Sequence, residues 1–124
     1  MFFSRKPGLQ YVHRGDPVDY DVTKGNITCD YTWRELDLSS IVPANAKLAD
    51  ITVTGSTSNA GYVGILHDKY GAVNHNLLFY LATPVAVGLF SGNFIIDISS
   101  NGKILYKVAT TCTLYTLTVR GWWI

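Results

Sequence analysis

The sequence predicts an all-β protein built from antiparallel strands, and three observations support this. Short runs in which apolar and polar residues alternate recur along the whole chain, as they do in strands with one buried face. Turn-forming residues bound these runs, and apolar residues at helical spacing are nearly absent. A chain of 124 residues has room for one core, so we expect a single two-sheet β-sandwich with eight or nine strands.

The N-terminal third is expected to contain an arm and two extended segments. Residues 1–12 form the arm, which is ordered only if something docks on it, and residues 13–124 form a single β-sandwich domain. The first expected strand covers Asp19 to Thr23 and is followed by a turn at Lys24-Gly25-Asn26. A second extended stretch runs from Thr28 to Leu38.

The middle of the chain is expected to hold an ordered connection and two strands. Residues 39–46 contain Pro43, which pushes Val42 out of the helical region, so this piece connects strands. The strand over residues 49–57 alternates clearly. Its expected inner face holds Ile51, Val53 and Gly55, and its outer face holds Thr52, Thr54 and Ser56. A further strand covers Tyr62 to His67.

The segment from Leu77 to Ile96 has no formal charge over twenty residues, which is the length of a membrane-spanning helix. Pro84, Gly88 and the polar turn Ser91-Gly92-Asn93 interrupt this segment. We therefore expect two or three short strands joined by turns, and no insertion into a membrane.

The C-terminal part is expected to form a hairpin and a long final strand. Residues 94–98 alternate, and Asn101-Gly102 separates them from the run Ile104 to Val108, which is the strongest short hairpin signal in the chain. The last expected strand covers Thr113 to Trp122, with Tyr115, Leu117 and Val119 on one face. Together these strands predict a sandwich of jelly-roll type.

The chain is poor in charge. Hydrophobic residues make up 48% and charged residues 15% of the sequence, whereas about 25% of residues are charged in an average protein. The 10 basic and 9 acidic residues leave a net charge of +1, so the chain has no basic footprint of the kind that binds nucleic acid. We expect no nucleic-acid partner.

The charge deficit is regional, because Asp97 is the only formally charged residue between Tyr70 and Gly102. Alternating strands can bury one face of this region in the core of a monomer, so the other face needs a partner surface. We expect that face to form the interface of a homo-oligomer. Its candidate residues are Leu78, Tyr80, Val85 and Val87.

Residues for catalysis or metal binding do not assemble into a motif. Cys29 and Cys112 have no metal-ligand spacing, and they could form a disulfide or stay reduced. His67-Asp68 is the only place where a histidine adjoins a carboxylate, and no serine or cysteine lies in a nucleophile-elbow context. No glycine-rich loop for phosphate is present either. We therefore expect no enzyme activity, no metal and no cofactor.

The acidic residues Asp16, Asp19 and Asp21 cluster near the N-terminus. A calcium site needs several converging oxygen ligands, so we interpret this cluster as a solvated strand end. Arg14-Gly15-Asp16 spells a tripeptide that some integrins recognise, but a turn before Pro17 explains these residues adequately.

Two tryptophans lie at the C-terminus. Alternation puts Trp122 and Trp123 on opposite faces of the last strand, so at most one of them lies in the core. The other needs a partner surface, which a neighbouring subunit would provide, and Trp123 therefore joins the interface candidates. A sugar-stacking platform is the alternative, with Tyr62 and Trp123 as glycan-binding candidates.

Three stretches together resemble a known family. They are Arg14-Gly15-Asp16-Pro17-Val18-Asp19-Tyr20-Asp21 with Thr23, then Thr32-Trp33-Arg34-Glu35-Leu36-Asp37-Leu38-Ser39-Ser40-Ile41-Val42-Pro43-Ala44, and finally Lys103-Ile104-Leu105-Tyr106-Lys107-Val108 leading to Thr118-Val119-Arg120-Gly121-Trp122. From about residue 14 to its end, the chain resembles the small β-sandwich modules of tailed-phage and prophage virion proteins, at head fibres, decoration proteins and tail-fibre tips. The charge-poor segment matches none of the motifs.

The resemblance implies a jelly-roll or C1q/TNF-like fold, a homotrimer and a non-enzymatic function on the surface of a virus particle. A capsid or tail protein of the same particle would then be a partner. The arm is the expected attachment, with Arg5 and Lys6 facing an acidic patch on that partner. The alternative function is a carbohydrate-binding β-sandwich that recognises glycans on the host cell surface, and a receptor-binding spike would combine the two.

Overall fold

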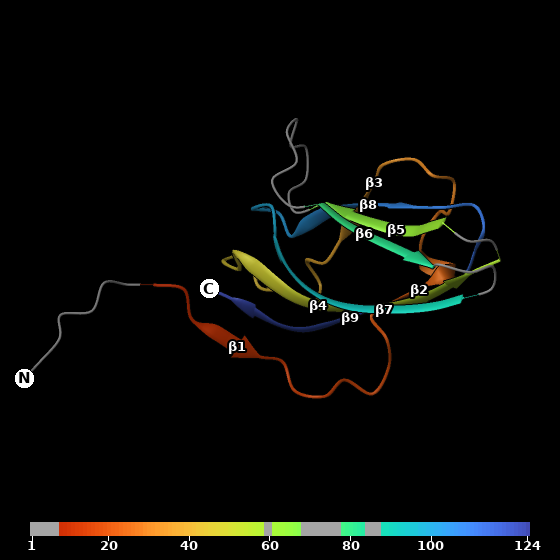
Figure 1. Cartoon of the computed structure of the whole chain (residues 1–124). Helices are drawn as coiled ribbons and strands as arrows, with labels where there is room; N and C mark the ends of the chain where they lie inside the picture. Colours follow the sequence, from red (N-terminus) through yellow and green to blue (C-terminus); the bar gives the residue numbers. More distant parts are fainter. Residues whose placement is uncertain (1–7, 59–60, 68–77, 84–87) are drawn as a thin grey trace, which may run out of the picture.

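The computed structural model describes residues 8–58, 61–67, 78–83 and 88–124 of the chain. These residues form two antiparallel sheets that face each other across a common core (Figure 1). The all-β class is confirmed, and the arrangement is consistent with a β-sandwich. One short 3₁₀ helix, η1 (Lys24–Asn26), lies at the predicted turn.

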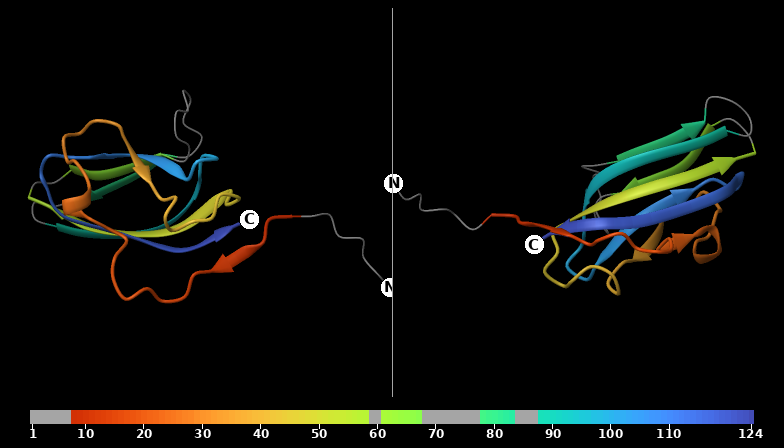
Figure 2. Two further views of the ribbon diagram at one scale, coloured as in Figure 1. Left: turned by 180° about the vertical axis from the view of Figure 1, so that it is seen from behind. Right: turned by 90° about the horizontal axis from the view of Figure 1, so that it is seen from below.

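The first sheet has five described strands. They are β1 (Tyr11–His13), β2 (Val22–Thr23), β4 (Leu48–Thr57), β7 (Gly88–Asp97) and β9 (Cys112–Trp123). Their order is β1-β9-β4-β7, and β2 also pairs with β9, beyond the end of β1. The long strands β4 and β9 therefore form the centre of this sheet, as the view from below shows (Figure 2).

The second sheet has four described strands. They are β3 (Arg34–Asp37), β5 (Gly61–His67), β6 (Leu78–Thr83) and β8 (Lys103–Val108). Their order is β3-β8-β5-β6. The free edges of the two sheets come together on one side, where β6 of the second sheet lies against β7 of the first.

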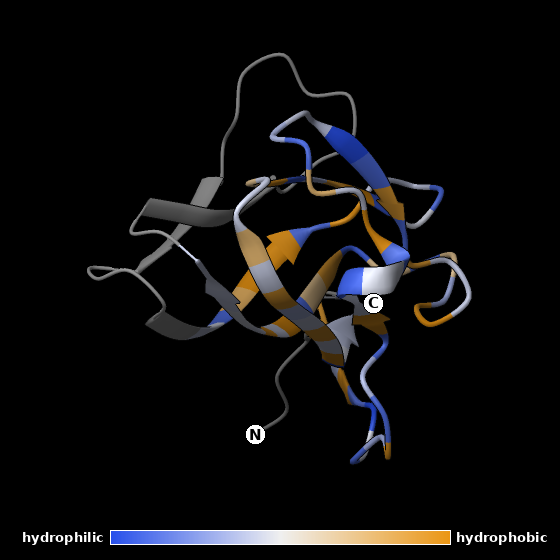
Figure 3. Cartoon of the chain, turned by 90° about the vertical axis from the view of Figure 1, so that its right-hand side faces the viewer, coloured by the Kyte–Doolittle hydropathy of each residue, from blue (hydrophilic) through white to orange (hydrophobic). Residues whose placement is uncertain are grey.

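The core lies between the sheets and is built by alternation. Burial along β4 alternates at every residue, which confirms the predicted inner face of Ile51, Val53 and Gly55, and bands of opposite hydropathy follow one another along the strands (Figure 3). The largest side chains with less than 2% exposure are Tyr115, Leu38, Ile51, Ile96, Ile104, Leu117, Val53, Val108 and Val119. Both sheets and the connection after β3 contribute to this set.

Two register shifts in β9 change which side chains face the core. Asp50 lies opposite Gly121 and Ile51 opposite Val119, so Arg120 has no partner on β4. A bulge of this kind turns all following residues to the other face. Trp122 consequently packs against the core, and Trp123 lies on the outer face.

The predicted hairpin at Asn101-Gly102 is wrong. The strand before this turn, β7, pairs with β4 in the first sheet, whereas β8 pairs with β3 and β5 in the second. The turn therefore carries the chain from one sheet to the other. Gly102 has a φ of +78°. The left-handed backbone expected for a hairpin turn is therefore present, but in a turn that connects the two sheets.

The predicted break at Ser91-Gly92-Asn93 is also wrong, because β7 runs through it without interruption. The three residues pair with Thr54, Val53 and Thr52 of β4. Ser91 and Asn93 are exposed and face the same way as the two threonines, so a polar tripeptide fits a strand that has one solvated face.

Two other predicted strands are shorter than expected. Of the extended stretch from Thr28 to Leu38, only β3 pairs in a sheet, and the preceding residues form an irregular loop. Of the strand predicted for Asp19 to Thr23, only β2 pairs. In both places the backbone bonds to isolated groups of the neighbouring strands instead of forming a continuous ladder.

The described part of the predicted arm lies along the C-terminal strand. Tyr11 and Val12 pair with Trp123 and Trp122 in β1, and Gln10 and Ile124 exchange two backbone hydrogen bonds of 3.0 Å. The first described residues thus lie beside the C-terminus (Figure 1).

Several predicted site residues lie outside what the structure describes. This holds for Arg5, Lys6, Val85 and Val87, and for the side chains of Tyr62, Leu78 and Tyr80, whose backbones lie in β5 and β6. Their predicted roles stay predictions. Within the described ranges, no helix is long and apolar enough to cross a membrane.

Candidate functional site

A loop with a strained backbone precedes β3. Tyr31 has a φ of +57° and is the only non-glycine residue with positive φ in the described part of the chain. A left-handed backbone costs an L-residue with a Cβ about 1–2 kcal/mol, and glycine or asparagine usually takes such positions. The Tyr31 N–H donates to the Val108 carbonyl over 2.8 Å, which fixes the loop to the end of β8.

Side chains on both sides of Tyr31 hold the loop in place. Asp30 Oδ1 accepts hydrogen bonds from the Thr32 N–H at 3.2 Å and from Arg34 Nε at 3.1 Å, and Arg34 also bonds the second carboxylate oxygen. The Arg34 guanidinium therefore lowers the pKa of Asp30 below its usual value. On the other side, the Thr28 N–H donates to Tyr106 Oη at 3.0 Å.

The loop presents two aromatic rings to one cation. Lys107 Nζ lies 4.3 Å from the centre of the Tyr31 ring and 5.8 Å from that of the Trp33 ring, within the range of cation–π attraction. No carboxylate in the described ranges pairs with Lys107. By contrast, Lys103 on the same strand pairs with Glu35 at 3.1 Å. We refer to Tyr31, Trp33 and Lys107 as the aromatic site.

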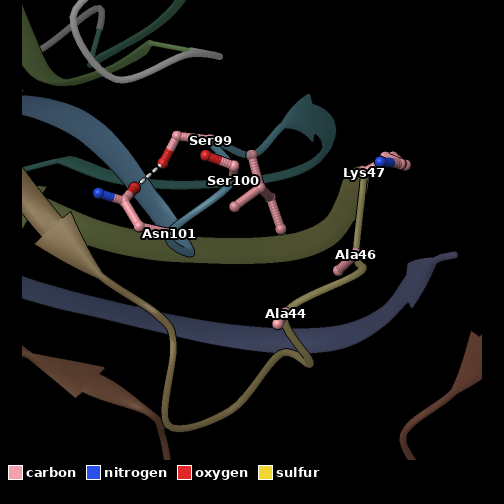
Figure 4. Close-up of a pocket in the computed structure, with 7 residues that line it drawn as sticks. Ala44, Ala46, Lys47, Ser99, Ser100 and Asn101 are labelled. Atoms are coloured by element: carbon pink, nitrogen blue, oxygen red, sulfur yellow. Dashed lines mark hydrogen bonds between the residues drawn. The ribbon is translucent and has the colours of Figure 1, made fainter.

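A pocket lies at one end of the molecule, where two connections meet. It is a pocket of about 480 Å³ lined by Ala44, Ala46, Lys47, Ile98, Ser99, Ser100 and Asn101 (Figure 4). A smaller pocket of about 240 Å³ adjoins it and shares Ala44, Ser100 and Asn101. Part of the recognised motif, Val42-Pro43-Ala44, lies in these walls, and Val42 also belongs to the core.

The walls of this end pocket are rigid. Ser99 donates to the Asn101 side chain and accepts a bond of 3.0 Å from the Lys103 N–H. A Cβ on Gly102 would lie 2.9 Å from the Ser39 backbone, so the two connections touch there. The lining combines apolar side chains, small polar side chains and the single charge of Lys47, with no aromatic ring and no charged cluster, so the pocket has no feature that selects a ligand.

The tryptophan predicted to contact a partner is partly covered by its own chain. The Trp123 and Tyr11 rings are 4.7 Å apart. Tyr11 crosses over Gly121, where a Cβ would meet its hydroxyl at 2.3 Å, and it donates to Asp50 Oδ2 at 3.2 Å. Trp123 stays half-buried and on the outer face, so its predicted role at an interface or a glycan site remains a prediction.

Arg14 and Asp21, near the N-terminus, have a structural role that the sequence does not predict. Asp21 Oδ2 accepts the Val119 N–H at 2.7 Å and pairs with Arg14, which also donates to the Val119 carbonyl at 3.1 Å. These two side chains bond the Val119 N–H and carbonyl, which a neighbouring strand would otherwise bond, in the gap between β1 and β2. The Arg14 guanidinium is therefore engaged within the chain, which weakens the adhesive interpretation of the tripeptide.

The two cysteines are free thiols that interact with each other, Cys112 in the core and the partly buried Cys29 packed against it. Cys112 donates to the Leu114 carbonyl at 3.1 Å. Burial, with a smaller contribution from the neighbouring Cys29, raises the pKa of Cys112 to about 11. No group of three metal-ligating side chains forms anywhere in the described ranges.

The aromatic site was missed because Tyr31 and Trp33 lie more than 70 positions from Lys107 in the sequence and only the pairing of β3 with β8 brings them together. The single local sequence signal for this site is the turn-forming run Asp30-Tyr31-Thr32. Comparison with known proteins adds no information on function: no model of a protein family matches the chain, and no curated protein is similar to it.

Proposed function

We propose that this protein is a structural protein of a tailed-phage virion, a jelly-roll module that forms a homotrimer on the particle surface. The virion assignment rests on the resemblance of three sequence stretches to head-fibre, decoration and tail-fibre modules. One structural observation supports the oligomeric part of the proposal, and it concerns the edges of the two sheets.

The charge-poor segment forms the edge strand of both sheets on the same side. In the described ranges β6 pairs only with β5, and β7 only with β4, and β6 and β7 lie against each other. Exposed edge strands invite pairing with other chains unless charges or coverage prevent it. In the described ranges this side has a single charged residue, Asp97 at the end of β7, and Ile95 on β7 is 48% exposed.

The opposite edge of the second sheet shows the contrast. There β3 has the sequence Arg-Glu-Leu-Asp, and its three charged residues are exposed. Charged side chains on an edge strand discourage association. The distribution of charge thus favours contacts between copies on the β6–β7 side, where the candidates Leu78, Tyr80, Val85 and Val87 fall in or beside the edge strands.

Light scattering on the purified protein tests the oligomeric state. We expect three times 13.7 kDa for the natural sequence, and a monomer when Tyr80→Lys or Ile95→Lys puts a charge on the edge strands. Val18→Lys is the matched control, because Val18 is 98% exposed in the loop before β2 and its variant should remain trimeric. A natural protein that is monomeric at micromolar concentration would refute this part.

Immunogold labelling of purified particles tests the location. The protein should co-purify with intact particles and be labelled on their outer surface, whereas its absence from washed particles would overturn the virion assignment. If the protein is attached through the arm, Arg5→Glu with Lys6→Glu should release it from the particle without changing its oligomeric state.

A further inference from the structure

We propose that Tyr31, Trp33 and Lys107 form a binding site for an anionic saccharide, a sugar chain that carries carboxylate or phosphate groups. This inference goes beyond a structural function on the particle and does not depend on it. Three features of the aromatic site lead to it: the strained position of Tyr31, the missing counter-ion of Lys107 and the rigidity of the loop.

The backbone at Tyr31 is strained, although Tyr31 belongs neither to the core nor to the residues packed against it. Its side chain remains 44% exposed, so packing in the core does not explain why a tyrosine takes a left-handed position. Strained, exposed side chains held by their surroundings occur at binding and catalytic sites. The position therefore points to a use for the exposed part of the ring.

Among the residues that the structure describes, no carboxylate pairs with the cation at the site. Each of the two nearest basic residues along these strands, Arg34 and Lys103, has a carboxylate partner, whereas Lys107 is held over aromatic faces. Lys107 is half-buried as a residue, and opposite charges attract more strongly at a protein surface than in bulk water. A ligand that supplies the anion completes the pair.

The aromatic rings and the polar loop define the rest of the ligand. A pyranose ring has an apolar face of C–H groups that packs on an exposed aromatic ring, and hydroxyl groups at its rim that need hydrogen-bond partners. The Thr32 hydroxyl and the Asp30–Arg34 pair lie beside the rings and can provide them. Since the loop is already ordered by its own hydrogen bonds, binding costs little conformational entropy.

The site is a surface rather than a cavity, which suits one unit of an extended polymer. A single pyranose can lie on the exposed part of Tyr31 while its neighbours continue into solvent. Carboxylates of uronic acids and phosphates of polyol-phosphate chains share the required charge. The test therefore includes both.

Saturation-transfer NMR and calorimetry with defined oligosaccharides test the proposal. The probes are an oligogalacturonate, a glycerol-phosphate oligomer and, as the neutral control, a malto-oligosaccharide. We expect one of the two anionic probes to bind, the neutral probe to bind about tenfold more weakly, and 0.5 M salt to reduce the affinity. The anionic probe that binds identifies the source of the charge.

Four variants locate the binding. Lys107→Gln and Tyr31→Asn should each weaken binding about tenfold, and Lys107→Arg should restore it because the charge returns. Asparagine tolerates a left-handed backbone, so Tyr31→Asn should fold. Lys47→Gln is the matched control, since Lys47 is another exposed cation, lies in the end pocket and has no carboxylate partner in the described ranges.

Three outcomes would overturn the inference. They are failure of both anionic probes to bind, equal binding of the neutral probe, and unchanged affinity in Lys107→Gln or Tyr31→Asn. Light scattering on the same samples keeps this test separate from the proposed assembly, because the aromatic site lies on the β3–β8 side and its variants should stay trimeric.

Discussion

At the scale of single residues, the least expected feature of the core is the hydroxyl group of Tyr115. The residue is 1% exposed, and its hydroxyl has no hydrogen-bond partner in the part of the chain that the structure describes. Burial raises the pKa of Tyr115 above its usual value. Burying a polar group without a hydrogen-bond partner destabilises the folded state. At this position the ring fills the core, and its hydroxyl lowers the free energy of unfolding.

Tyr115→Phe should therefore stabilise the protein by about 1 kcal/mol. Tyr106→Phe is the matched control, because the Tyr106 hydroxyl accepts a hydrogen bond from the Thr28 N–H and its removal should cost about 1 kcal/mol. Urea denaturation measures both changes. A loss of stability in Tyr115→Phe would mean that its hydroxyl has a partner in solution.

At the scale of elements, β9 organises the first sheet. It pairs with β1, β2 and β4, and its bulges decide which of its residues enter the core. In the gap between β1 and β2, a side chain takes the place of a strand, because Asp21 accepts the Val119 N–H. Between the two short ladders of β1 and β2, the Asp21 carboxylate thus links the N-terminal segment to β9 through two partners.

Removal of that carboxylate should weaken the whole edge. Asp21→Ala removes the acceptor of the Val119 N–H and the carboxylate partner of Arg14, and we expect a loss of about 2–3 kcal/mol in the free energy of unfolding. Asp21→Asn keeps one acceptor oxygen and should cost about 1 kcal/mol. Asp19→Ala is the control, since Asp19 is exposed and surface changes usually stay within about 0.5 kcal/mol.

Hydrogen exchange distinguishes this local effect from general destabilisation. The Val119 amide should lose protection in Asp21→Ala and retain most of it in Asp21→Asn. Equal protection in the natural protein and Asp21→Ala would show that the backbone finds another partner.

At the scale of the whole molecule, the buried thiol and phenol make stability depend on alkaline pH. The pKa of Cys112 is raised to about 11 in the folded state, whereas an exposed thiol in the unfolded chain ionises near ~8.5. The unfolded state therefore loses its proton first. The stabilisation is complete below about pH 8.5 and is lost as the pH rises through 11, and Tyr115 adds to the decline above about pH 10.

Thermal denaturation in a reducing buffer between pH 8 and 11 measures this dependence. We expect Tm to fall with rising pH, and to fall less between pH 9 and 10 in Cys112→Ala, because an exposed thiol ionises at lower pH than an exposed tyrosine. Parallel pH profiles for the two proteins would contradict the assignment to Cys112.

Much of the fold could be predicted from local pattern, and the candidate site could not. The alternation over residues 49–57 predicted β4 and its inner face, because a strand with one buried face is encoded within its own residues. Asn101-Gly102 predicted the turn correctly and its sheet pairing incorrectly, since a turn sequence specifies backbone angles and not the partner of the next strand. Tyr31 and Lys107 meet only through the pairing of β3 with β8.

The sequence by itself determined the all-β class, the positions of most strands and the regional lack of charge, because these depend on side-chain period and composition. The tertiary structure decided where the charge-poor strands lie, at the adjoining edges of two sheets, and which tryptophan enters the core. The physical reason is that strand order and bulges are set by hydrogen bonds between segments far apart in the chain. The bulge at Arg120 puts Trp122 on the core face and Trp123 on the outer face, an assignment that alternation alone could not make.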